Sequence, residues 1–533
     1  MKVATSARYS APTSIWMAAT AILLAVAGTT SCSSGGATPK TPLLSGNTQV
    51  TVVLTGTAND QVTEFNVQFQ SLTLTTQSGK TVTLLSSQQP SEFIHLNTRI
   101  EPLTTATIPQ DIYTSAVVKL GGAEFVCDAQ VPGGGLGFAH YSVVNQGPTV
   151  SLTSPITITG SSMALLLNMQ VSNSAVFPSC WTTPAFEGFS MTPTFNLTPY
   201  VLSTSATNSG NGKVTGLKAT VAAVGTTASS STLSVAAGPF GTRTLSAAAN
   251  SATVFQGISG ASALSSGMFL DVDGVIQSDG SLLATRIEAE NPSAVNMSTG
   301  PIMQVDALVP VLLLYGRTEM GPLLTDPVNG QTGQYDEIPY FDFSNTKFQI
   351  SGQFTNLQTL PFVPSFDAAS MASGQTVDVT SGPLTLGGGT YDTANTITLI
   401  PQTINGTVVA SQQIGSFMDY SISLASYDLF PTLAVQQGQT TQLTNPNQME
   451  VYVDSNTEKV NTELLAPGET FRFYGLVFND SGTLRMDCAQ VSDGVPFSEQ
   501  SNASNQVTIS HAETTRRETP RGMQKVTTTI TRP

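Results

Sequence analysis

Two stretches of the sequence share one pattern, LSSGMFLDVDGVIQSDGSLLATRI at 264–287 and LAPGETFRFYGLVFNDSGTLRMDCAQV at 465–491. In each, a leucine and a glycine precede a short apolar strand, and a second glycine follows the first by seven residues. A polar turn comes next, and then another strand. Gly280 and Gly482 give these turns the positive φ that a β-hairpin needs at little steric cost. The pattern therefore predicts a repeated β-structure.

A weaker copy of the pattern lies between these two stretches, where 371–374 (MASG) precedes an apolar strand at 375–380. Each copy also opens with a comparable glycine-containing strand, and these strands lie at 212–216, 300–305 and 404–408. We therefore expect three β-barrel-like repeats, of which the second is degenerate, and we place them at 206–295, 296–392 and 393–498.

The repeats resemble a bacterial domain of unknown function that forms a small OB-like barrel. The resemblance rests on the glycine-flanked opening strand, the leucine–glycine turn and a final strand such as 282–287. It implies a closed sheet, which leaves no exposed edge for pairing with other chains. OB folds often bind oligosaccharides or oligonucleotides, but this is an analogy at the level of fold and identifies no site.

The chain before the repeats alternates apolar and polar residues with the period of a β-strand. Apolar residues occupy every second position over 65–69, and the apolar positions then shift to Leu72 and Leu74. One extra residue would turn the strand face at this point, so we expect a β-bulge near 70–71. Short strands separated by turns predict a β-sandwich over 48–205, and the protein as a whole is expected to be all-β.

The sandwich region resembles a domain of unknown function from bacterial envelope lipoproteins. The resemblance rests on the opening strand at 52–57, the bulged strand at 65–74 and the entry to a later strand at 108–113. It carries no catalytic motif, so it implies only the fold and the location of the protein.

The N-terminal residues predict export. Two basic residues precede a 14-residue apolar run at 15–28, which is short for a membrane span and typical of a secretory signal peptide. Small residues then lead to Cys32, a pattern that resembles the lipobox of bacterial lipoproteins. The resemblance implies a signal peptide over 1–31, lipid on Cys32 and a linker over 32–47.

A lipid anchor would make the membrane a partner and would hold the protein in the cell envelope, in the periplasm or at the cell surface. The alternative is an ordinary signal peptide with an incidental cysteine. Thr29 stands where the lipobox usually has leucine, which is why this alternative stays open.

The composition restricts the possible partners. Charged residues are only 10% of the chain, and the formal net charge of −15 argues against a nucleic acid partner. Residues 499–533 have five Lys or Arg, three Glu and few apolar residues, which predicts a disordered C-terminal tail.

Three cysteines remain besides Cys32. Cys127 and Cys180 both fall in the sandwich region, and in an oxidising compartment we expect a disulfide between them. Two buried free thiols are the alternative. Cys488 is in phase with Leu484 and Met486 on one strand, so we expect a thiol in the core.

The sequence contains no nucleophile elbow, zinc-protease motif or phosphate-binding loop. His95 and His140 lie in no recognisable motif, and His511 lies in the expected tail. We therefore expect neither enzymatic activity nor a cofactor.

One strand offers a possible metal pair. Asp271 and Asp273 are two residues apart, so their carboxylates share a strand face, as calcium ligands could. The corresponding residues of the other copies include Asp378, Arg472 and Tyr474, so the acidic pair is not a requirement of the repeat. We expect no metal here, and we interpret the pair as part of a solvent-facing strand edge.

The segment at 335–342 mixes acids and aromatic residues, which are the side chains that sugar sites use. We predict a ligand surface at Tyr335, Asp336, Glu337 and Tyr340. Charged residues that protect an aromatic strand are the alternative. The expected function is a structural, adhesive or binding role in the cell envelope, possible glycan partners included. A carbohydrate-binding protein is the second hypothesis, and a glycan-active enzyme is the third.

Overall fold

The computed structural model describes residues 44–494 except for several short segments. The segments left out are 58–61, 63, 97–98, 132–134, 144–148, 153, 175–191, 203–211, 226–229, 237–241, 291–295, 307–308, 321–338, 382–391, 426–427, 434–442, 461 and 463. The expected signal peptide, Cys32, Cys180 and the tail at 499–533 therefore lie outside the described residues. For Cys127 only the backbone, in a strand, is described.

The first domain is a β-sandwich. One sheet has the strand order β5-β1-β10-β11-β8, and the other has the order β3-β2-β6-β7, with β4 on β2 and β9 on β6. The elements are β1 (Asn47–Thr57), β2 (Glu64–Thr76), β3 (Thr81–Leu85), β4 (Gln89–Glu92), β5 (Glu101–Pro109), β6 (Asp111–Val131), β7 (Gly135–Val143), β8 (Thr149–Ser151), β9 (Ile156–Ile158), β10 (Ser162–Gln170), α1 (Val171–Ser174) and β11 (Thr194–Tyr200).

The expected bulge lies in β2. The pairing of β2 with β6 shifts register between Gln68 and Phe69 and again between Phe69 and Ser71. Leu72 and Leu74, after the shift, are buried like the apolar residues before it, so both halves of the strand contribute to the core between the sheets. The extra residue explains the change in apolar phase, as predicted.

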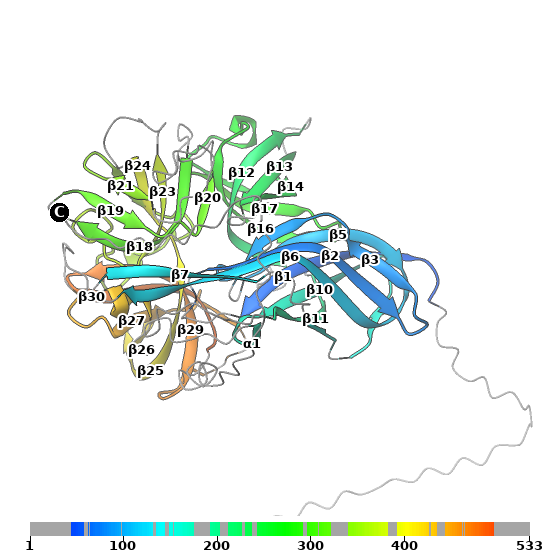
Figure 1. Cartoon of the computed structure of the whole chain (residues 1–533). Coiled ribbons are helices and arrows are strands. Elements are labelled where there is room, and N and C mark those ends of the chain that lie inside the picture. The colour runs from blue at the N-terminus through cyan, green and yellow to red at the C-terminus, as the bar shows by residue number, and fades with distance from the viewer. Residues whose placement is uncertain are drawn as a thin grey trace, which may run out of the picture. The chain divides into compact units, whose positions relative to one another are not determined.

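Three closed barrels follow the sandwich, and their strands can be traced in Figure 1. Barrel 1 contains β12 (Lys213–Val224), β13 (Ser230–Ala236), β14 (Thr242–Ala248), β15 (Val254–Gln256), η1 (Ala261–Ala263), β16 (Phe269–Ile276) and β17 (Leu282–Ala289). Barrel 2 contains β18 (Asn296–Asp306), β19 (Val311–Leu314), β20 (Thr318–Met320), β21 (Tyr340–Asp342), β22 (Lys347–Ile350), η2 (Leu357–Thr359), β23 (Thr376–Ser381) and β24 (Asp392–Leu399). Barrel 3 contains β25 (Gln402–Ile414), β26 (Phe417–Leu424), α2 (Leu429–Leu433), β27 (Gln448–Val453), β28 (Glu458–Val460), β29 (Thr470–Asp480) and β30 (Thr483–Asp493).

The barrels share one topology. In barrel 1, the opening strand β12 pairs with β13 and β16, and the parallel pair β14–β17 closes the sheet. Barrel 3 repeats this with β25 between β26 and β29 and with the parallel pair β27–β30. In barrel 2, β18 pairs with β19 and β23, and β21 pairs in parallel with β24. The degenerate middle copy therefore keeps the fold of the other two.

The repeated glycines have the same backbone role in each copy. Gly267, Gly374 and Gly468 adopt φ values of 88°, 94° and 89° in the turns before β16, β23 and β29. Seven residues later, Gly274 and Gly475 each lie at a register shift of the sheet. A Cβ on Gly274 would lie 2.7 Å from a backbone carbonyl oxygen, so a larger residue does not fit without movement. Close backbone contact at a bulge explains the conserved spacing between the copies.

The division between barrels 2 and 3 differs from the expectation. The strand β24 pairs with β22 and β23, so it belongs to barrel 2. Barrel 3 begins with β25 at Gln402, ten residues after the expected end of the second repeat at 392. The sequence pattern marked the opening strands well, but it did not show that the last strand of barrel 2 follows the segment 382–391.

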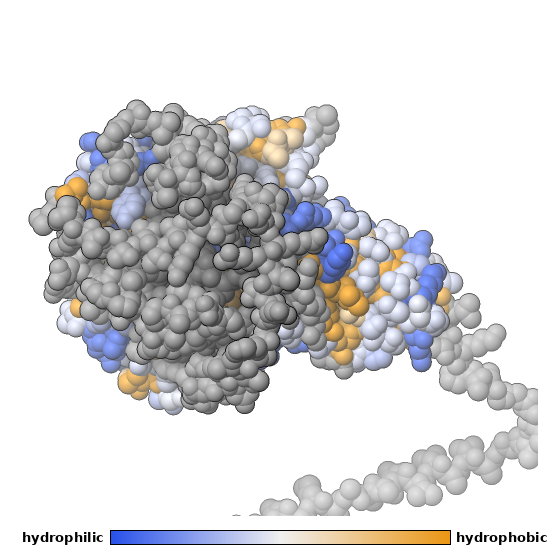
Figure 2. Space-filling model, in the orientation of Figure 1, coloured by the Kyte–Doolittle hydropathy of each residue, from blue (hydrophilic) through white to orange (hydrophobic). Residues whose placement is uncertain are grey.

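Each barrel has an apolar interior. The interior of barrel 3 includes Leu484, Met486 and Cys488, and the Cys488 thiol is free and buried, as expected. Among the coloured residues in Figure 2, hydrophobic ones occur as small patches between polar ones. Among the described residues, no helix has the length and apolar character needed to cross a membrane.

Candidate functional site: a charged junction between domains

Buried polar residues occupy the same position in all three barrels. Asp271, Asp378 and Arg472 each lie four residues after the turn glycine of their copy. Their neighbours along the strands are apolar and lie in the barrel interiors. Because successive side chains of a strand point to opposite faces, the three polar residues lie on the outer faces of the barrels. They are nevertheless at most 4% exposed, so other parts of the protein cover these outer faces.

Cross-strand partners extend each position into a row of three polar residues, all of them buried except Lys218 and Thr299, which are half-buried. The rows are Lys218, Asp271 and Glu288 in barrel 1, Thr299, Asp378 and Thr398 in barrel 2, and Asn405, Arg472 and Ser492 in barrel 3. A polar row therefore lies at the same position on the sheet in each barrel, while the side chains in the row differ from one barrel to the next.

Lys218 joins the rows of barrels 1 and 2. Its Nζ lies 2.8 Å from Oδ2 of Asp271 and 3.7 Å from Oε1 of Glu290, and it also donates to Asp378 of barrel 2. On the other side, the Thr398 hydroxyl of barrel 2 donates to Glu290 at 3.2 Å. The ammonium group is therefore surrounded by carboxylates from two barrels.

Arg286 is a second buried cation of barrel 1, and it pairs with three of this barrel's acids. Arg286 contacts Asp271 at 2.7 Å, Asp273 at 2.7 Å and Glu288 at 2.6 Å. Asp271 is 1% exposed and lies on a central strand, so the expectation that it belongs to a solvent-facing edge is wrong. The covering comes from barrel 2, whose position the sequence alone does not show.

The network shifts the pKa values of Asp271 and Glu290 in opposite directions. Burial opposes ionisation of Asp271, but Lys218 and Arg286 outweigh it and lower its pKa to about 2. For Glu290, burial raises the pKa to about 8 with the help of nearby carboxylates, although Lys218 opposes the change. At neutral pH the network thus combines ionised Asp271 with a largely protonated Glu290.

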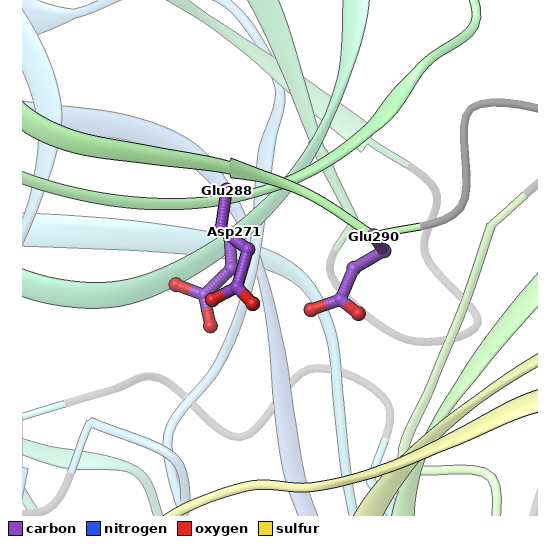
Figure 3. A group of neighbouring side chains, drawn as sticks. All are labelled: Asp271, Glu288 and Glu290. Atoms are coloured by element: carbon purple, nitrogen blue, oxygen red, sulfur yellow. The ribbon is translucent and has the colours of Figure 1, made fainter. Parts of the chain in front are cut away.

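The oxygens of Asp271, Glu288 and Glu290 lie within 4.8 Å of one another, a spacing that suits a metal ion. Figure 3 shows the side chains of Asp271 and Glu288 next to each other, with the carboxylate of Glu290 on the same side. Lys218 and Arg286 already bring positive charge to these carboxylates. The geometry therefore fits an internal ion-pair network, in which a metal would have to displace Lys218.

The sandwich meets the barrels through a second set of charges. His95 lies between two carboxylates, with Nδ1 2.9 Å from Glu92 and Nε2 2.6 Å from Glu101. Glu101 also pairs with Arg243 of barrel 1. Arg99 of the sandwich donates to the backbone carbonyl of Thr215 in barrel 1. Burial lowers the pKa of His95, against the attraction of Glu92.

A pocket of about 150 Å³ lies where these elements meet. We call it the junction pocket. Its lining includes His95, Arg99 and Glu101 of the sandwich, Lys218 of barrel 1, Thr299 and Arg317 of barrel 2, and Asp428, Phe430, Arg472 and Tyr474 of barrel 3. Members of all three polar rows thus line one cavity.

Of the four residues predicted to form a ligand surface, only Tyr340 is described, and it is not part of this pocket's lining. Tyr335, Asp336 and Glu337 lie outside the described residues. Tyr340 lies in β21, is half-buried and packs against a cluster that includes Tyr315. No sequence pattern pointed to Lys218, Arg286 or Glu290 as site residues, and His95 lies in no motif that would give it a role. The signal that could have found the rows is the polar residue four positions after each turn glycine.

Comparisons with known proteins give a family only for one barrel. Residues 219–288, which run from β12 to β17 in barrel 1, match a domain of unknown function, DUF5666. No curated protein matches the chain. Among solved structures, a glycoside hydrolase of family 32 from Bifidobacterium adolescentis aligns at 8% identity over 83% of this chain and 67% of that chain. Its TM-score of 0.10 carries no argument about fold or activity. Barrel 1 is therefore similar to an uncharacterised domain, within an all-β chain of several small barrels.

Proposed function

We propose that this protein is an exported, lipid-anchored component of the cell envelope with a structural and non-catalytic role. In this role it presents a sandwich and three barrels as one connected body outside the cytoplasm. The main structural observation behind the proposal is that charged side chains at the junction connect one domain to another. Lys218, Arg243 and Arg99 each make a contact that joins two domains.

The surroundings of His95 support a role without catalysis. A general base needs a ring nitrogen within hydrogen-bond reach of the proton that it removes. Both ring nitrogens of His95 are instead engaged by carboxylates, those of Glu92 and Glu101. The histidine thus connects β4 and β5 of the sandwich, while Glu101 continues to Arg243 of barrel 1.

The envelope location rests on the N-terminal sequence. An apolar run at 15–28 ends in small residues and Cys32, the arrangement that precedes lipid attachment in bacterial lipoproteins. Each acyl methylene contributes about 0.8 kcal/mol to membrane binding, so two or more chains hold a large polar body at a bilayer.

The test is the intact mass of the mature protein isolated from membranes. We expect a chain that begins at Cys32 and carries the added mass of acyl groups. Cys32→Ala should lose that mass and leave the particulate fraction, whereas Ser33→Ala, the matched control, should keep both. A Cys32→Ala protein that is processed normally and stays particulate would contradict the anchor.

A further inference from the structure

Lys218 places an amine against a carboxyl group of another barrel. Its Nζ donates to Oδ2 of Asp378, a fully buried residue of β23 in barrel 2. The two residues are 160 positions apart in the sequence. A buried ion pair has to overcome the cost of removing two charges from water. An amine and a carboxyl group in contact can also lose both charges by condensing to an amide.

The second oxygen of Asp378 has a donor of its own. The Thr299 hydroxyl donates a hydrogen bond to Oδ1. When an amine attacks a carboxyl carbon, negative charge develops on the oxygen that is retained, and a positioned donor stabilises that charge. The arrangement therefore favours attack of Lys218 on the Asp378 carbon, with Oδ1 retained and Oδ2 as the leaving oxygen.

Glu290 lies where a proton has to be moved. Its Oε1 is 3.7 Å from Nζ of Lys218, and this buried oxygen accepts no hydrogen bond from the described residues. The Thr398 hydroxyl donates to the other oxygen at 3.2 Å and so orients the carboxyl group. Burial raises the pKa of Glu290 to about 8, so near neutral pH the group can both release and take up a proton. A proton shuttle requires this property.

The other carboxylate beside Lys218 is less suited to the reaction. Asp271 pairs with Lys218 and Arg286, and these cations lower its pKa to about 2. Its negative charge opposes attack by an amine. Burial raises the pKa of Asp378 instead, although Lys218 opposes the change, so this acid is the more easily neutralised of the two.

The reaction balances without a further reactant. The Lys218 ammonium gives one proton to Oδ2 of Asp378, which leaves a neutral amine and a neutral acid in contact. The Nζ–Cγ bond then forms and the Cγ–Oδ2 bond breaks. Glu290 gives a proton to the leaving oxygen and takes one from Nζ, so that oxygen departs as water and nothing is oxidised or reduced. Lys218 and Thr299 line the junction pocket, which offers the water a space to enter.

We propose that Lys218 and Asp378 form an intramolecular isopeptide bond, with Glu290 as the proton shuttle. The bond replaces two buried charges by a neutral amide and joins barrels 1 and 2 covalently. The ion pair is the state before this reaction, and its response to pH belongs to chains in which the bond has not formed. Because only residues of the folded body take part, the proposal does not depend on export or on lipid attachment.

The test compares intact masses measured after denaturation. Wild-type protein should be lighter than Lys218→Arg by one water molecule beyond the difference between the two side chains. Any signal cleavage, lipid or disulfide that both proteins carry cancels in this comparison. Lys213→Arg makes the same substitution at an exposed lysine of the same strand, so it should still lose the water. Proteolysis of the wild type should give one branched peptide that contains Lys218 and Asp378.

Two further variants test the roles of the acids. Asp378→Ala removes the carbon that is attacked and should abolish the bond. Glu290→Gln should leave most chains without the bond, because a positioned acid–base group contributes at least about a hundredfold to the rate of such a step.

A wild type that keeps the water, or a branched peptide joined at Asp271, would overturn the proposal. Glu290→Gln protein that carries the bond as completely as the wild type would also overturn it. The branched peptide is sought in the wild type itself, so the proposal stays testable if a substituted protein does not fold.

Discussion

Barrel 2 meets its two neighbours through different side chains, and buried charges take part in one of the two contacts. Against barrel 3, the ring of Phe362 packs 5.3 Å from Tyr452 and 5.6 Å from Phe478, measured between ring centres. Against barrel 1, the contact includes the charged residues Lys218, Asp378 and Glu290, beside a small apolar cluster of Phe269, Met297 and Met320. The barrels share a topology, so the difference comes from the side chains on their outer faces and not from the fold.

This comparison indicates how side chains on the outer faces of the repeats can determine which barrels pack together. Apolar contacts are strong but tolerate several arrangements, whereas a buried ion pair is costly unless each charge meets its partner. The contact between barrels 1 and 2 should therefore depend on pH and on individual charges. The contact between barrels 2 and 3 should depend on volume and show little response to pH.

The largest effect is expected at the apolar contact. Phe362→Ala removes a ring that is 9% exposed and packs on two aromatic residues of barrel 3. We expect the free energy of unfolding to fall by about 3–5 kcal/mol, as for other buried phenylalanines. Chemical denaturation at pH 5 and pH 8 should give the same loss. A loss that doubles between these pH values would mean that charges also act at this contact.

The next effect concerns the central cation. Lys218→Met keeps much of the side-chain volume but leaves Asp271 and Asp378 without their shared partner. We expect a loss of about 3 kcal/mol at pH 8, near the lower end for a broken buried pair, because Arg286 still pairs with Asp271.

The loss caused by Lys218→Met should be smaller at pH 5, where buried carboxylates without a cation can take up protons. Denaturation of the variant and the wild type at both pH values measures this. An equal loss at pH 5 and pH 8 would show that Lys218 contributes packing alone.

A smaller effect follows from Glu290. Its pKa is about 8 in the folded protein, above its ordinary value of 4.5, so the folded state holds a proton that the unfolded chain releases. This group therefore lowers the free energy of unfolding as pH rises from about 5 to 8. Glu290→Gln should flatten this decline in a pH series of denaturation curves. A decline of unchanged slope in the variant would assign it to other groups.

The smallest effect is expected at a surface pair. Lys213 lies on the same strand as Lys218, but its side chain is 47% exposed and pairs with Glu458 at 3.2 Å. Lys213→Met should change the free energy of unfolding by less than about 1 kcal/mol, because water screens an exposed pair. It is the matched control for Lys218→Met. A similar loss in both variants would remove the distinction between buried and exposed lysines.

The sequence predicted the parts of the fold that depend on local chemistry. The sequence predicted the turn glycines at 267 and 468, the bulge of β2 and the apolar phase of the strands. A positive φ favours glycine, and a strand with one buried face alternates apolar and polar residues, so both features can be recognised in the sequence. These features together predicted the three repeats, including the degenerate middle copy.

The junction could not be predicted in the same way. Whether Asp271 faces water or a neighbouring barrel depends on contacts between residues more than a hundred positions apart, such as Lys218 with Asp378. The alternation of the strand places Asp271 outside its own barrel, but it does not show that another barrel covers this position, so the expectation of a solvent-facing edge is wrong. His95 shows the same limit, since its partners Glu92 and Glu101 form no motif in the sequence.

The most direct test of the account is a double-mutant cycle between Lys218 and Asp378, with unfolding measured at pH 8. If the two charges join barrels 1 and 2, Asp378→Asn should restore part of the stability lost in Lys218→Met, with a coupling energy above about 1 kcal/mol. Strictly additive losses of the two substitutions would contradict the account, because the barrels would then be joined without this pair of charges.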